Sequence, residues 1–231
     1  MQNSDDASRS DVAGPARHRG RPRAFAREVA LGQAMRLFWT KGYEATSIAD
    51  LTAAMGIGAP SLYAAFGCKE ALYLEALSHY GQSYEGLVWD GFQAAPTARE
   101  AIAALLYDSA AALTGCAADL PHGCMVALAA VDGEAHPALC DRLRSARATT
   151  LERLIARLQR GVAEGELAPG LDCRALARFV QTVQAGMSLL ARDGTGREEL
   201  ERVAELAMRG LEARLGDVPA GGDGSRLPPA R

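Results

Sequence analysis

The feature that most restricts the fold lies between residues 24 and 66, where a long amphipathic segment precedes two very short apolar segments bounded by glycines. From residue 24 to 41, apolar side chains recur at spacings of three and four, which predicts a helix with one buried face. Gly42 then ends this helix as a C-terminal cap. The apolar set is Val29, Leu31, Ala34, Met35, Leu37 and Phe38.

The next two segments are each about two helical turns long. Ser47, with Asp50 three residues later, predicts a capping box that opens a helix over 48–55, which Gly56 ends. A further helix over 59–66 has Pro60 in its first turn, where a missing N–H costs little. Two short helices joined by a tight turn, after a longer helix, predict a helix-turn-helix unit.

The rest of the chain also reads as helical, because no segment shows sustained strand alternation with turn residues. We therefore predict an all-α protein, with an N-terminal three-helix helix-turn-helix domain and a larger C-terminal helical domain. The predicted division is a disordered basic arm over 1–22, the DNA-binding domain over 23–68, the larger domain over 69–215 and a disordered tail over 216–231. The further predicted helices cover 69–92, 97–113, 124–130, 137–164, 173–191 and 197–215.

Charge is distributed unevenly along the chain. The formal net charge is −3, but residues 1–70 hold nine Lys or Arg against seven Asp or Glu. Six arginines between residues 9 and 27 face one acidic residue, Asp11. A basic arm on an acidic body is typical of a protein that touches DNA at one end.

Other functional classes find little support. The five cysteines include no CxxC pair and the four histidines are scattered, so we expect no metal and no cofactor. No nucleophile–base pattern or phosphate loop is present, which argues against an enzyme. A weak candidate for an active site is the group His122, Glu134 and His136. No apolar run is long enough for a membrane span and the first ten residues are polar, so we expect a cytoplasmic protein without membrane contact.

Residues 27–77 resemble the TetR family of bacterial repressors. The resemblance rests on the runs GYEATSIADL (42–51), AMGIG (54–58) and SLYAAFGCKEAL (61–72). Its glycine, threonine, Leu-Tyr, Phe and Lys-Glu-x-Leu positions match the family pattern. The resemblance implies a homodimeric repressor that binds a double-stranded palindromic operator and is released by a small-molecule effector, here unidentified. An architectural DNA binder without an effector is the competing interpretation.

Short or polar side chains at the start of the second short helix suit close approach to base edges in the major groove. The hydroxyls and free N–H groups of Thr46 and Ser47, at the start of the first short helix, can hold a phosphate. Lys69 resembles a lysine with which the family contacts phosphate. Ser47 also serves as a cap without any phosphate, Tyr63 can instead be core, and each arm arginine can instead be a solvated tail. The DNA-binding candidates are Thr46, Ser47, Ala59, Pro60, Ser61, Tyr63, Ala64, Lys69, Arg21 and Arg23.

The predicted recognition helix departs from the usual pattern. It lacks Lys, Arg, Asn, Gln and His, the side chains that make bidentate contacts to bases. Specificity then rests on Ser61, on apolar contact with thymine methyl groups and on DNA shape. Cys68 also stands where the family often has a capping Ser or Asn.

The last two helices are expected to form the dimer, or else only to complete the core of each subunit. Their apolar residues are Phe179, Val180, Val183, Met187, Leu190, Leu200, Val203, Leu206, Ala207 and Leu211. The family's ligand pocket lies among the middle helices, although most buried aromatics and methionines are simply core. The candidate lining residues are Trp89, Phe92, Tyr107, Met125, Leu128, Phe179 and Met187.

Cys124 offers an alternative sensor. The run GCMV (123–126) resembles segments of redox- and electrophile-responsive members of the family. A thiol near a helix N-terminus can react as the thiolate, whereas the simpler interpretation is a buried structural cysteine.

Overall fold

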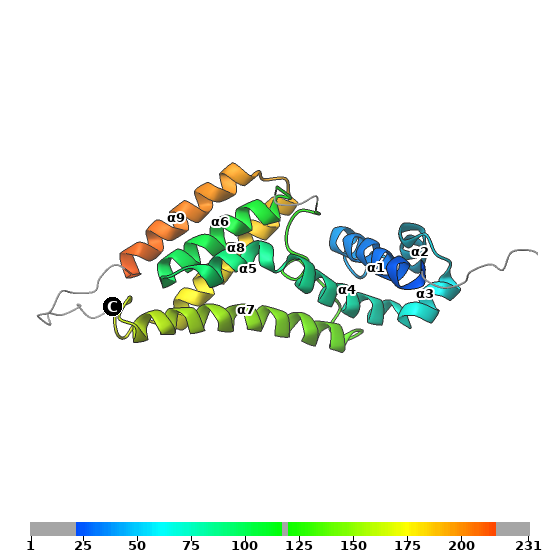
Figure 1. Cartoon of the computed structure of the whole chain (residues 1–231), viewed down its shortest axis with the longest axis horizontal. Helices are drawn as coiled ribbons and strands as arrows, with labels where there is room; N and C mark the ends of the chain where they lie inside the picture. The colour runs from blue at the N-terminus through cyan, green and yellow to red at the C-terminus, as the bar shows by residue number, and fades with distance from the viewer. Residues whose placement is uncertain (1–21, 117–119, 216–231) are drawn as a thin grey trace, which may run out of the picture.

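The computed structural model describes residues 22–116 and 120–215, without the side chains of 22–26 and 213. Within these residues the chain forms nine α-helices and no strand, which confirms the all-α prediction. Figure 1 shows α1–α3 grouped at one end of an elongated molecule and α5–α9 at the other, with α4 between them. The predicted basic arm and tail lie outside the described residues, apart from Pro22 at the start of α1.

The helix-turn-helix unit consists of α1 (Pro22–Lys41), α2 (Ile48–Met55) and α3 (Ala59–Phe66). Ser47 and Asp50 form the predicted capping box at the start of α2. Gly56 ends that helix with φ +65°, a left-handed angle that side-chain-bearing residues rarely adopt. Leu51 and Leu62 are completely buried, so the two short helices close one apolar core against α1.

The predicted single helix over 69–92 is wrong. The structure has α4 (Lys69–Tyr84) and α5 (Gly86–Ala94), separated at Glu85. Glu85 keeps right-handed helical angles, so the break is a kink next to Gly86, a residue that stabilises helices poorly. The kink changes which core the chain enters: the first half of α4 packs with α1, whereas Trp89 and Phe92 pack in the larger domain.

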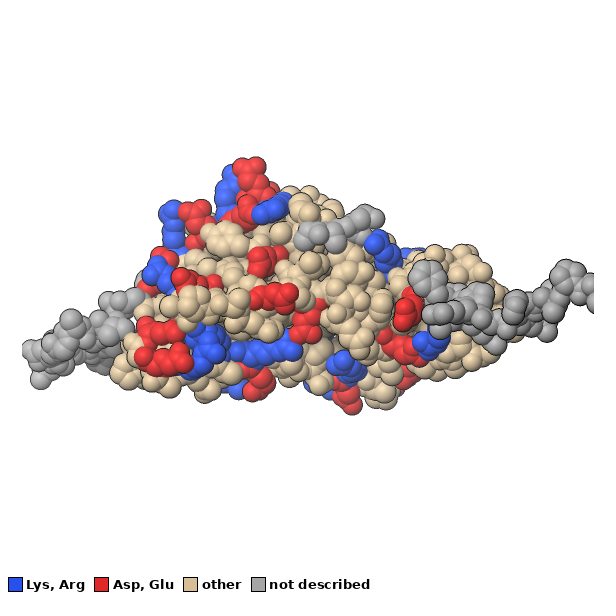
Figure 2. All heavy atoms as spheres, viewed as in Figure 1, with Lys and Arg blue, Asp and Glu red and all other residues tan. Residues whose placement is uncertain are grey.

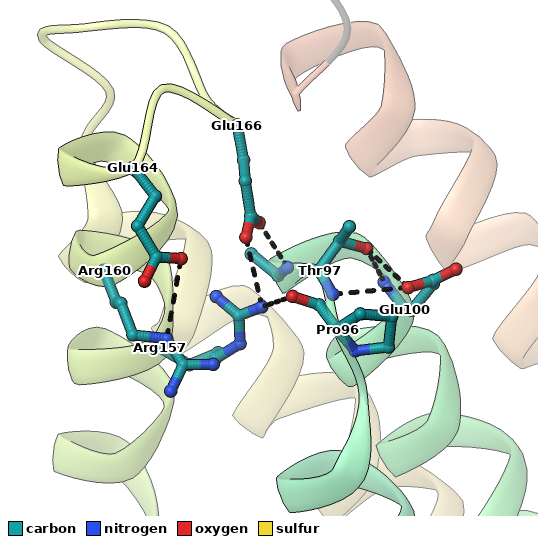
Figure 3. A network of polar contacts seen from close by, with 8 residues as sticks. Pro96, Thr97, Glu100, Arg157, Arg160, Glu164 and Glu166 are labelled. Atoms are coloured by element: carbon teal, nitrogen blue, oxygen red, sulfur yellow. Dashed lines mark hydrogen bonds and ion pairs between the residues drawn. The ribbon is translucent and has the colours of Figure 1, made fainter.

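The larger domain adds α6 (Ala98–Leu113), α7 (Pro137–Ala163), α8 (Cys173–Arg192) and α9 (Arg197–Leu215). Figure 3 shows how the start of α6 is tied to the turn between α7 and α8. The buried Arg157 guanidinium donates to the Pro96 carbonyl at 2.9 Å and pairs with Glu166 at 3.4 Å. Glu166 also accepts the Ala98 N–H at 2.6 Å. Burial raises the pKa of Glu166, but this hydrogen bond and Arg157 outweigh burial and lower it.

The predicted helix over 124–130 is also wrong. This stretch consists of turns, with one helix-type bond from Leu128 N–H to the Cys124 carbonyl at 3.0 Å. Tertiary partners bind two backbone groups at the start of this stretch: Cys124 N–H donates to the Ser188 hydroxyl at 2.8 Å, and the Gly123 carbonyl, which the first turn of a helix would use, accepts from Trp39 Nε1 at 3.0 Å. Residues 122–130 are therefore a strap that joins α1 to α8.

Gly123 gives a test of this strap. We expect Gly165→Ala to cost about 1 kcal/mol, because Gly165 has φ +78° but its Cβ would meet open space. Gly123 has a similar φ, +80°, but its Cβ would lie 2.8 Å from the Ser188 carbonyl oxygen. Gly123→Ala should therefore cost about 1–3 kcal/mol more than Gly165→Ala, measured by urea unfolding. Equal losses of unfolding free energy in the two variants would show that the strap can move away from α8 without cost.

Candidate nucleic-acid interface and effector cavity

Helix α3 has one buried face and one exposed face. Leu62 and Phe66 are buried in the domain core. The opposite side carries Tyr63, 48% exposed, together with Pro60, Ser61 and Ala64, while Ala59 is partly exposed. Apart from Tyr63, these outward side chains are short, which allows the helix backbone to approach a surface closely, as major-groove reading requires.

Arg27 of α1 fixes the orientation of α3. Its guanidinium lies over the Phe66 ring at 4.5 Å and donates to the Ala65 carbonyl at 3.2 Å. The same group pairs with Glu75 of α4 at 2.8 Å. The residue was visible in the sequence only as one of several arm arginines. Its role depends on the packing of three helices, so nothing local indicated it.

The start of α2 holds a carboxylate of its own. Asp50 accepts from the Ser47 N–H at 2.9 Å and pairs with Lys41 at 3.0 Å. The Ser47 backbone and hydroxyl, followed by Lys41, hold the pKa of Asp50 well below its usual range. The Ser47 hydroxyl is exposed but already donates to Asp50 at 2.8 Å. A phosphate at this helix start would therefore meet a charged Asp50 that Lys41 neutralises.

Thr46 has a different role from the predicted one. Its side chain is completely buried, and its hydroxyl donates to the Gly42 carbonyl at 2.6 Å. This corrects the prediction that the Thr46 hydroxyl contacts a phosphate, because the group instead fixes the turn between α1 and α2.

Lys69 lies at the start of α4, with its ammonium over the Tyr43 ring at 4.2 Å. Burial lowers the pKa of Lys69, and the negative charge of Glu44 partly opposes this. The Cys68 thiol does cap the helix, accepting the Ala71 N–H at 3.4 Å. Arg21 lies outside the described residues, and Arg23 is described only as backbone in α1.

A cavity of about 940 Å³ lies among α4, α5, α6, α7 and α8, with the strap forming part of its wall. Of the predicted lining residues only Trp89 reaches it. The other six are corrected: Phe92, Met125 and Met187 are buried in the two cores, Tyr107 and Phe179 are exposed, and Leu128 lies outside the lining. The wall instead includes Trp39, Tyr80, Tyr84 and Cys124. The four-residue spacing of the two tyrosines on α4 was the sequence signal that could have found them.

The cavity wall is also the joint between the two domains. Trp39 of α1 packs edge-on against Tyr80 at 4.8 Å, and the Tyr80 hydroxyl donates to Cys124 Sγ at 3.3 Å. Arg192, at the end of α8, donates to the carbonyls of Trp39 at 2.8 Å, Thr40 at 3.3 Å and His122 at 3.0 Å. These five residues, Trp39, Tyr80, Gly123, Cys124 and Arg192, are called the joint below.

Comparisons with known proteins agree with this geometry. Residues 30–76 match the model of bacterial regulatory proteins of the tetR family, and residues 98–207 match the tetracyclin repressor-like C-terminal domain. The repressor ComR of Escherichia coli (strain K12) is 36% identical over 203 residues, 83% of this chain and 91% of ComR. The chain belongs to the TetR family. It is a DNA-binding transcriptional repressor and not an enzyme.

Two further TetR-family relatives extend the comparison. The repressor BdcR of Escherichia coli (strain K12) is 32% identical over 201 residues, 85% of this chain and 94% of BdcR. The regulator CifR, as a variant with three cysteines replaced and in complex with 26-bp double-strand operator DNA, has 44% identity and a TM-score of 0.77, covering 82% of this chain and 98% of that one.

The described part of this TetR-family chain has no helix long and apolar enough to cross a membrane. The same residues bring together no group of three or more His, Cys, Asp or Glu side chains that could hold a metal ion.

Lys69 and Tyr63 can be separated by their expected effects on DNA binding. Lys69→Met should weaken binding to all duplexes alike and lower the slope of log affinity against log salt by about 1, because one phosphate contact is lost. Tyr63→Phe removes only a hydroxyl and should cost about 1 kcal/mol. Fluorescence anisotropy on a duplex selected from a random pool measures both. Arg160→Met, at the far end of α7, is the control. If Lys69→Met has the same DNA affinity and salt dependence as Arg160→Met, Lys69 does not contact DNA.

Proposed function

We propose that this TetR-family repressor binds a palindromic operator as a homodimer, and that a small molecule in the cavity releases it from DNA. The observation that carries the proposal is that Trp39 connects the DNA-binding domain to the cavity. It is buried in α1 of the DNA-binding domain and lines the cavity of the other domain. A ligand in the cavity therefore touches the helix that carries the recognition unit.

The joint supports a route for the release. A ligand that moves Tyr80 or the strap changes the packing of Trp39, and Arg192 is bonded to the last carbonyls of the same helix. A ligand shifts an equilibrium only by its differential affinity for two states. The state favoured by a filled cavity is then one in which α1, with α2 and α3 packed on it, has a different position relative to α8.

The dimer is proposed to form through a narrower face than the sequence predicted. Of the ten apolar residues on the last two helices, Val180, Met187, Leu200, Ala207 and Leu211 are buried in their own subunit. Leu206 on α9 is 68% exposed, and Phe179 and Leu190 on α8 are 44% and 42% exposed. Exposed apolar side chains this large on two adjacent helices favour a two-fold bundle with a second copy.

A charge in this face tests the dimer. Leu206→Glu should give a folded monomer in sedimentation velocity, because the carboxylate would lose its hydration in the interface. Its affinity for the selected operator should fall by roughly a hundredfold or more, since one half-site contributes far less than two. Ala156→Glu, an exposed change on α7, should remain dimeric. A dimeric Leu206→Glu protein would contradict this interface.

Selection of bound duplexes from a random pool tests the DNA-binding part of the proposal. We expect enrichment of a palindrome whose half-sites lie one helical turn apart, because two copies of α3 must enter successive major grooves. Enrichment of a single half-site, or of no sequence, would contradict sequence-specific binding by a two-fold dimer.

A second candidate, sensing by a cysteine thiol, is favoured by the position of Cys124. The residue is partly buried, lines the cavity and belongs to the joint. Its sulfur accepts a hydrogen bond from Tyr80, whose pKa is raised by burial first and by Cys124 second. An electrophile that enters the cavity would alkylate this sulfur and remain as a covalent ligand.

N-ethylmaleimide tests both the cysteine and the coupling. The Cys124 sulfur adds to the maleimide double bond, and the thiol proton ends on the neighbouring carbon. The exposed Cys68 and Cys116 are replaced by Ser in every protein, and mass spectrometry confirms one adduct at Cys124. We expect the adduct to lower operator affinity at least tenfold, and Cys124→Ala in the same background to be insensitive. A complete adduct with unchanged affinity would contradict both cysteine sensing and the coupling of cavity to DNA.

A further inference from the structure

The opening of the cavity is positively charged, and the proposed release from DNA does not by itself explain this charge. Six arginines and two glutamates contribute to the lining, although the whole chain has a net charge of −3. All six arginines are exposed, so they lie at the outer end of the cavity: Arg142, Arg144, Arg147, Arg153, Arg174 and Arg178. Figure 2 shows Lys and Arg atoms in blue over part of α7, along the lower edge of the molecule, with Asp and Glu atoms beside them.

Most of these arginines have no anionic partner. Arg153 pairs with Glu85 and lies over the Trp89 ring, and Arg144 pairs with Asp141. Within the described part of the chain, no carboxylate forms an ion pair with the remaining four, Arg142, Arg147, Arg174 and Arg178. Like charges held around one opening repel each other, and the arrangement is stabilised when an anion enters.

Two of the four are held in place across the mouth. Arg147 of α7 donates through Nη1 to the Val126 carbonyl of the strap at 3.0 Å. Arg178 of α8 donates through Nη1 to Gln181 Oε1 at 2.6 Å, and Gln181 Nε2 donates to the Arg147 carbonyl at 2.7 Å. Each guanidinium therefore has a fixed anchor and keeps other N–H donors free. A planar guanidinium of this kind suits a carboxylate, which accepts two parallel hydrogen bonds.

The inner end of the cavity has the opposite character. Its buried lining is largely apolar and aromatic, with Leu77, Trp89, Leu113, Leu120 and Leu151 all less than one-tenth exposed. We propose that the cavity binds an amphipathic organic carboxylate, with its apolar body against these side chains and its head between Arg147 and Arg178. The proposal rests on the function proposed above, because it gives the chemical class of the effector.

The depth of the cavity favours a small molecule over an acidic macromolecule as its ligand. A protein or nucleic-acid surface would meet the arginines without filling the space behind them. The volume of about 940 Å³ is within the range of small-molecule sites.

The two tryptophans of the chain, Trp39 and Trp89, both line this cavity, so intrinsic fluorescence reports on it directly. We propose to titrate the full chain with decanoate and with decanamide, which has the same shape without the charge. Decanoate is expected to bind roughly tenfold or more tightly, because a charged hydrogen bond replaces a neutral one. This preference should shrink as salt is raised, whereas decanamide binding should not weaken.

Arg147→Gln combined with Arg178→Gln should reduce decanoate affinity to about that of decanamide and leave decanamide binding unchanged. Arg160→Gln combined with Arg214→Gln removes two charges outside the cavity lining and should leave both affinities unchanged. Thermal unfolding confirms that both proteins are folded. The proposal is overturned if the two probes bind wild type equally, if neither binds, or if the Arg147/Arg178 variant retains the preference for decanoate.

Adding operator DNA to the same titration separates this inference from the proposed function. Decanoate that binds with the expected charge preference but does not release operator would support the anion site and contradict effector release. A protein that binds a palindromic operator but neither probe would retain its DNA-binding function and lose the anion site.

Discussion

The joint between the two domains of this repressor includes one guanidinium, that of Arg192, which bonds to both of them. Arg192 lies at the end of α8, and its donors reach the carbonyls of Trp39 and Thr40, which end α1, and that of His122 in the strap. The last carbonyls of a helix have no partner within the helix and carry partial negative charge. A partly buried cation at this point satisfies them, and burial lowers the pKa of Arg192. The position of α1 thus depends on the position of α8.

The contact between α1 and α8 explains how a ligand in the cavity could move the recognition helices in the proposed release from DNA. Helix α8 takes part in the domain core and the cavity wall, and its exposed apolar residues belong to the proposed dimer face. In the proposed dimer, a shift of α1 against α8 changes the spacing of the two recognition helices, because α8 is fixed at the two-fold axis. At the other end of the domain, the buried Arg157–Glu166 pair ties the start of α6 to the α7–α8 turn.

Local chemistry determined most helix boundaries, and these could be predicted. The capping box of Ser47 and Asp50, Gly56 at a positive φ and Pro60 in a first turn each act within a few residues, so α2 and α3 begin and end where expected. The failures occurred where distant groups decide. The stretch 124–130 is apolar enough for a helix, but Trp39 and Ser188 bind backbone groups at its start. A sequence pattern contains no information about such partners.

The same distinction between local and distant determinants explains which residues of the DNA-binding face and the cavity could be predicted. The exposed face of α3 follows from helical periodicity, so its small residues were identified. The cavity lining required knowledge of the kink at Glu85, which directs Phe92 into the core and leaves Tyr80 and Tyr84 facing the cavity. Thr46 is an exception, because its partner is local: a hydroxyl at a helix start suits a phosphate and a neighbouring carbonyl equally well, and here the turn brings the Gly42 carbonyl oxygen within 2.6 Å of the Thr46 hydroxyl.

The short side chains of α3 make the proposed release effective. Long side chains such as Arg or Gln can follow a base edge when the backbone moves, whereas Ser61, Ala59 and Ala64 cannot extend. Contacts made by a methyl or hydroxyl group are lost within about an ångström, because dispersion and hydrogen bonding both fall steeply with distance. A recognition helix of this composition therefore demands close approach in both half-sites at once. In the proposed dimer, a small displacement at the joint in both subunits would therefore remove the base contacts, while the phosphate contacts would weaken only gradually.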